Sequence, residues 1–136
     1  MVKVRASVLA VAALASACGG PSNPVTGNGG RTTLLEVQTQ VLTPRCALSG
    51  CHVGTGAPFG LDMSSVSASA AHLVNVDSGE NASMKRVLPG DSANSYMYWK
   101  ITGNPAIGGQ QMPLSGGPLS QAQIDLVASW IDEGAK

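Results

Sequence analysis

The sequence predicts an all-α domain of about four helices joined by long loops. Apolar residues recur at helical spacing in several segments, and no segment alternates apolar and polar residues as a half-buried strand does. The 17 glycines and 8 prolines gather between these segments. Only five residues are aromatic, so we expect a domain whose side chains alone fill its core poorly.

Length and charge restrict the class of protein. The 136 residues suffice for one domain. At 43% hydrophobic residues, the chain is too apolar for a disordered tail. Its eight basic side chains are balanced by eight acidic ones, so nucleic acid is not an expected partner. The three cysteines are an odd number, which requires an explanation in an exported protein.

The first 17 residues have the features of a signal peptide. Lys3 and Arg5 precede an apolar run of twelve residues, too short for a membrane span of about 20 residues but suited to the core of a signal. The run ends in Leu14-Ala15-Ser16-Ala17-Cys18, which resembles the lipobox of bacterial lipoproteins, where the cysteine becomes the new N-terminus and carries lipid. The alternative is an ordinary signal peptide cut after Ala17, which would leave Cys18 as a free thiol.

The mature chain is expected to begin with a tether. Residues 18–31 are rich in glycine, proline, serine and asparagine and show no apolar periodicity. The folded domain is therefore expected over residues 32–136. The lipobox resemblance implies a lipoprotein of the bacterial cell envelope, facing the periplasm or the cell surface and held to a membrane through lipidated Cys18.

The first helix of the domain is expected to begin at Thr32 or Thr33 and to run to about Leu42. Apolar residues at i, i+3 and i+7 give it one buried face: Leu34, Val37 and Val41. We expect it to end at Thr43-Pro44, because the residue before proline is disfavoured in helical conformation.

Two shorter helices are expected in the middle of the domain. Ser64 or Ser65 can begin the first, and Asp91 can cap the second, which extends to about Ile101. A loop over residues 103–117 follows, with five glycines and two prolines. Loops of this length inside compact domains are often functional.

The final helix has the clearest sequence signal. Ser120 and Gln123 form a capping box. Apolar residues at i, i+3, i+4 and i+7 follow: Ile124, Val127, Ala128 and Ile131. Gly134 is expected to stop the helix.

The segment Cys46-Ala47-Leu48-Ser49-Gly50-Cys51-His52 has the residue order that attaches c-type haem. Each thiol can form a thioether with a haem vinyl group, and a histidine directly after the second cysteine is carried beneath the ring. Four residues separate the cysteines here instead of two, and Ser49-Gly50 allows this longer loop to bulge. The alternative is a Cys46–Cys51 disulfide beside an ordinary loop histidine.

Met112 is the candidate for a second axial ligand. It lies in the glycine-rich loop, 60 residues after His52, where a methionine has little reason to be core filler. A thioether suits haem iron, and a His/Met ligand pair raises the reduction potential. Met97, on an aromatic-rich helix, is better explained as packing.

These motifs resemble a small class I cytochrome c, in which an N-terminal helix precedes the haem motif, a Met-Pro loop supplies the distal ligand and a C-terminal helix packs across the first. More narrowly, the chain resembles the exported c-type cytochrome domains of planctomycetes and myxobacteria. The matching segments after the haem motif are Gly60 to Met63, Pro89 to Lys100, Met112-Pro113 and Leu119 to Ala135.

The resemblance implies one covalent haem c, with Cys46 and Cys51 attached to it and His52 and Met112 on its iron. The Gly56-Ala57-Pro58 turn is expected to supply the carbonyl that accepts the Nδ1 proton of His52. Candidates for binding the haem propionates are Arg86, Tyr98, Trp99 and Lys100. His72 is expected to be a surface histidine rather than a ligand.

The resulting hypothesis is a fold that surrounds a haem and carries single electrons between redox partner proteins, without catalysing a reaction. A haem-free chain would then be poorly folded. One alternative is a haem enzyme or gas sensor with a displaceable Met112. Another is a non-haem exported module with a Cys46–Cys51 disulfide, which could bind copper through His52 and Met112.

Overall fold

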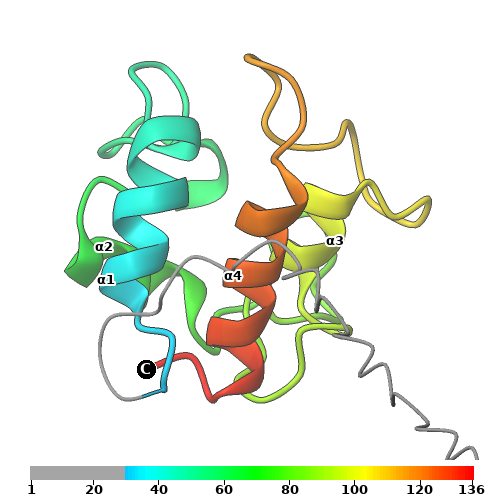
Figure 1. The fold of residues 1–136 in the computed structure, drawn as a ribbon. Helices are drawn as coiled ribbons and strands as arrows, with labels where there is room; N and C mark the ends of the chain where they lie inside the picture. The colour runs from blue at the N-terminus through cyan, green and yellow to red at the C-terminus, as the bar shows by residue number, and fades with distance from the viewer. Residues whose placement is uncertain (1–29) are drawn as a thin grey trace, which may run out of the picture.

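The structure, a computed structural model, describes residues 30–136 (Figure 1). The expected signal peptide, Cys18 and nearly all of the tether lie outside the described residues. Six helical segments follow in order: α1 Leu34–Val37, the π-helical η1 Gln38–Cys46, the 3₁₀ turn η2 Pro58–Gly60, α2 Val66–Leu73, α3 Tyr96–Thr102 and α4 Gln121–Asp132.

The described part of the chain is all-α, as expected. Within residues 30–136 the β-type pairing consists of two isolated bridges, one between Val74 and Val87 and one between Asp77 and Lys85. No described helix is long and apolar enough to cross a membrane.

The first helix begins as expected but runs further. Thr33 and Glu36 form a capping box, in which the Glu36 N–H donates to Thr33 Oγ1 over 3.3 Å. The helix then passes through Pro44 and ends at Cys46, so the expected end at Thr43-Pro44 is wrong. The reason is a change of hydrogen-bond register: over η1 the bonds follow the wider π pattern, and the Ala47 N–H donates to Leu42 O, five residues back, over 2.7 Å. This extension carries Cys46 to the end of a rigid element.

The two middle helices differ in how well their starts were predicted. Ser65 caps α2 by accepting the Ala68 N–H over 3.1 Å, as expected. Asp91 does not cap α3, because its carboxylate accepts from the backbone and side-chain nitrogens of Asn94 and closes a local turn. The helix therefore begins only after Ser95.

The last helix packs against both α1 and α3 (Figure 1). The predicted capping box of Ser120 and Gln123 is present, and α4 ends at Asp132, two residues before Gly134. Hydrogen bonds tie this end of the chain to the first helix: Leu34 N–H donates to Lys136 O over 3.1 Å, and Gln123 Nε2 donates to Gln40 O over 3.0 Å. The first and last helices thus form one scaffold.

The core lies between these helices and reaches the loops beside them. Trp130 is its largest fully buried side chain. The cluster also includes Cys46, Met63 and Met97, which come from η1, the following loop and α3. The core therefore extends directly beneath the segment that carries the cysteines.

Candidate functional site

The four residues predicted to hold a cofactor line one pocket. Cys46, Cys51 and His52 reach it from the end of η1 and the loop that follows, and Met112 reaches it from the loop between α3 and α4. The space in and over the pocket that no atom fills is about 1070 Å³, a volume that includes open solvent. Its apolar wall is formed by Leu61, Met63, Leu73, Met97, Ile101, Pro113 and Leu114, among others.

The loop between the two cysteines is closed by its own backbone. The Cys51 N–H donates to Leu48 O over 2.9 Å, and the His52 N–H donates to Cys46 O over 3.2 Å. Gly50 adopts a left-handed conformation with φ +78°, which an L-residue disfavours. The four-residue spacing is therefore accommodated by a compact bulge that turns both cysteines toward the pocket.

The ring of His52 is oriented by a backbone carbonyl. Its Nδ1 lies 3.2 Å from Leu61 O, and because a carbonyl only accepts, Nδ1 must carry the proton. Burial lowers the pKa of His52, and the nearby cations Arg86 and Lys100 lower it further, while the hydrogen bond to Leu61 opposes the shift. The imidazole is therefore neutral at neutral pH, and the lone pair of Nε2 is available to a metal.

The carbonyl that orients His52 is not the predicted one. Leu61, rather than the Gly56-Ala57-Pro58 turn, supplies it. The chain reverses at η2, where Phe59 has φ +54°, and the Met63 N–H then donates to His52 O over 2.9 Å. The reversal brings Leu61 to the ring, whereas Pro58 only lines the pocket.

Cys46 and Cys51 are free thiols in the structure. Cys46 is 8% exposed, and burial raises the pKa of its thiol to about 11, although the neighbouring Arg45 opposes the shift. The thiol is thus protonated at neutral pH and is not an activated nucleophile. Within residues 30–136, no group of three or more His, Cys, Asp or Glu side chains is placed to hold a metal ion.

Met112 is attached to α3 through its backbone. Its N–H donates to Lys100 O over 2.8 Å, and the preceding Gln111 donates from Nε2 to Ile101 O over 2.9 Å. Met97 and Met63 also line the pocket, but both are buried in the core cluster, as expected for Met97.

Two of the four candidate propionate-binding residues line the pocket. Arg86 and Lys100 do so and are each 9% exposed. Tyr98 and Trp99 do not: Tyr98 packs against the core from outside it, and Trp99 donates from Nε1 to Ala93 O over 2.6 Å. Helical geometry explains the difference. Residues four apart lie on the same face of a helix, and Lys100 lies on the face of α3 that borders the pocket. Tyr98 and Trp99 are only two and one residues from Lys100, so they lie on other faces.

Among the residues that line the pocket, Tyr96, Glu80 and Gly79 were not predicted from the sequence. Tyr96 lies one turn before Lys100 on α3, so helical spacing from Lys100 could have identified it. Glu80 and Gly79 come from an irregular segment between α2 and α3, and nothing in their local sequence points to the pocket.

His72 lies away from the pocket. It is half-buried, and its Nδ1 is 3.2 Å from the backbone nitrogen of Asp62 and 3.1 Å from the backbone oxygen of the same residue. It is less exposed than expected, but its contacts are those of a structural histidine.

Comparison of this chain with protein-family models, with curated proteins and with solved structures finds no match. The function of the pocket must therefore be inferred from its own residues and geometry.

Proposed function

We propose that this domain is a monohaem c-type cytochrome that carries single electrons. One observation supports the proposal above the others. Two thiols and an imidazole from residues 46–52 and a thioether from the loop between α3 and α4 line one largely apolar pocket. These are the groups that covalent haem attachment and six-coordinate haem iron require.

The residues fit the group. Cys46 and Cys51 would form the thioethers. Both are free thiols at the pocket wall, Cys46 buried and Cys51 half-buried. His52 would bind through Nε2, since Nδ1 is occupied by Leu61 O. Met112 would bind through its sulfur. When bound, haem supplies a one-electron couple between ferric and ferrous iron.

The pocket also offers positive charge for the haem propionates. Arg86 donates from its guanidinium to His72 O over 2.9 Å and to Phe59 O over 2.7 Å. Among the described residues it forms no ion pair with a carboxylate, and burial lowers its pKa. A buried cation bonded only to carbonyls is stabilised by an anion, so Arg86 is the preferred propionate partner.

Electron transfer fits these residues better than catalysis does. With His52 and Met112 both bound, the iron would have no open position for a substrate. The apolar wall formed by residues such as Leu73 and Ile101 keeps water away, which together with the thioether ligand favours a raised reduction potential. The domain would exchange electrons with redox partner proteins at its open mouth.

The proposal includes a location. If Cys18 is lipidated, the tether over residues 18–31 would hold the domain close to membrane-bound partners and raise their effective concentration. The domain would then act as an anchored electron carrier of the bacterial cell envelope.

The test is expression of the full chain in a host that matures c-type cytochromes. We expect a haem-stained band, an intact mass that includes one haem, and a low-spin spectrum with a methionine-to-iron band near the red end of the visible range. An intact mass that lacks haem and is lower by two hydrogens would refute this proposal. It would favour the exported module with a Cys46–Cys51 disulfide, which could bind copper. A high-spin spectrum would favour a haem enzyme or gas sensor.

A further inference from the structure

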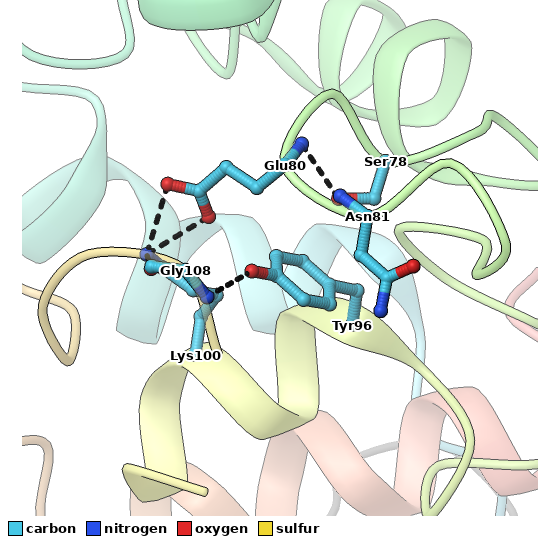
Figure 2. Close-up of polar contacts among 6 residues, drawn as sticks. All are labelled: Ser78, Glu80, Asn81, Tyr96, Lys100 and Gly108. Carbon is cyan, nitrogen blue, oxygen red and sulfur yellow. Dashed lines mark hydrogen bonds and ion pairs between the residues drawn. The ribbon is translucent and has the colours of Figure 1, made fainter. Parts of the chain in front are cut away.

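The loop that carries Met112 is fastened to α3 by a cluster of polar contacts (Figure 2). We infer that Glu80, Tyr96, Lys100 and Gly108 form a latch that holds Met112 in position as the distal ligand. This inference rests on the proposed function and makes Glu80, Tyr96 and Lys100 positioning residues.

Both backbone groups of Gly108 are bound by side chains of α3. Lys100 Nζ donates to Gly108 O over 2.8 Å, and the Gly108 N–H donates to the hydroxyl of Tyr96 over 2.8 Å. Because Tyr96 and Lys100 lie one helical turn apart, both side chains bind the same peptide segment from one face of α3.

Lys100 holds the loop at two places. Its side chain binds Gly108, and its backbone oxygen accepts the Met112 N–H over 2.8 Å. The five-residue stretch from Gly108 to Met112 is therefore fixed at both ends to a single residue of α3. A loop closed in this way leaves its methionine little freedom to move away from the pocket.

Glu80 supplies the charge that keeps the Lys100 side chain in place. Its carboxylate lies 2.9 Å from Lys100 Nζ through one oxygen and 3.3 Å through the other. The two side chains are only 22% and 11% exposed, so solvent screens the pair weakly. The carboxylate therefore fixes the ammonium group of Lys100 beside Gly108 O.

The position of Glu80 is itself set by a buried serine. Ser78 is 4% exposed, and its Oγ accepts the backbone N–H groups of Glu80 and Asn81, each over 3.3 Å (Figure 2). This turn directs the Glu80 side chain toward the loop. The fit at the loop is close, since a Cβ on Gly108 would lie 3.4 Å from the Tyr96 hydroxyl.

The exposed ion pair of Asp77 and Lys85 provides a matched control. It also joins a carboxylate to a lysine, but its side chains are 64% and 39% exposed and it does not line the pocket. Neutralising Asp77 therefore removes a comparable charge without touching the latch. For the hydroxyl, Tyr98 is the control, because it lies on α3 outside the pocket.

The experiment uses the ferric holoprotein and titrates it with imidazole, which competes with Met112 for iron. We expect Glu80→Gln and Tyr96→Phe to raise the apparent imidazole affinity about tenfold, the ratio that corresponds to losing one hydrogen bond of this kind. The methionine-to-iron band should weaken and the reduction potential should fall. Asp77→Asn and Tyr98→Phe should match the wild type in all three measurements.

Each other result has a definite meaning. If wild-type protein carries haem and shows the methionine band, but Glu80→Gln and Tyr96→Phe leave imidazole affinity and potential unchanged, the latch is refuted and the cytochrome proposal stands. A haem protein without the methionine band also refutes the latch alone. Wild-type protein without covalent haem refutes both. Tyr96→Phe removes a single oxygen, so it keeps the test decisive should Glu80→Gln not fold.

Discussion

Replacing Arg86 by glutamine should destabilise the domain substantially. Arg86 is 9% exposed, and its guanidinium donates to two backbone carbonyls, His72 O and Phe59 O. A hydrogen bond from a charged group contributes about 1.5 kcal/mol, so loss of both predicts a decrease of about 3 kcal/mol in the free energy of unfolding. The measurement is a urea or guanidinium titration of the purified holoprotein, read at its midpoint and slope.

Arg45 provides the control for this prediction. It donates to three backbone carbonyls, Gly116 O over 3.0 Å, Gly117 O over 2.7 Å and Pro118 O over 3.5 Å, but all three bonds are exposed to solvent. Water can replace an exposed donor, so Arg45→Gln should decrease the free energy of unfolding by about 1 kcal/mol or less. Equal effects at the two positions, or an Arg86→Gln effect below about 0.5 kcal/mol, would show that burial does not decide the contribution of these bonds.

Three further predictions concern the site. Met112→Ala should lower the reduction potential and abolish the methionine-to-iron band; an unchanged potential in a redox titration would remove Met112 from the site. A chain with Cys46→Ala and Cys51→Ala should lack covalent haem and show a weak, non-cooperative thermal transition by circular dichroism, whereas a sharp transition would mean that the side chains suffice as a core. Burial raises the pKa of Tyr96 in the folded state, so its stabilising contribution is present below the unfolded pKa of about 10 and is lost as pH rises through the folded value. Tyr96→Phe should therefore reduce the loss of stability above about pH 10 in denaturant titrations, compared with Tyr98→Phe.

The sequence correctly predicted helix starts where the capping residue and its hydrogen-bond partner are close together in the chain. Ser65 and Ser120 cap helices through bonds that span three residues, so the pattern contains all the partners. The prediction that Asp91 caps a helix was wrong for a related reason. An aspartate can close a turn as well as cap a helix, and Asn94 provides the partner for the turn. The prediction that the first helix ends at Thr43-Pro44 was wrong because the chain continues through Pro44 in the wider π register of η1.

The side chains that line the pocket depended on contacts over long sequence separations. Tyr98, Trp99 and Lys100 were all candidate donors to the propionates. The packing of α3 directs only Lys100 of these three to the pocket, together with Tyr96. Glu80 had no sequence signal, since its role comes from a turn held by Ser78 and from a lysine 20 residues away.

By itself, the sequence determined the helical class of the domain and the four chemical groups expected at the site, Cys46, Cys51, His52 and Met112. It could do so because helix caps and periodicity are local, and because the choice of thiol, imidazole and thioether reflects the chemistry of the ligand. Only the tertiary structure decided that Leu61 orients His52, that Arg86 is a buried cation without a carboxylate partner, and that the Met112 loop is bound to α3. These features depend on backbone carbonyls and on burial, which arise only when distant segments of the chain pack together.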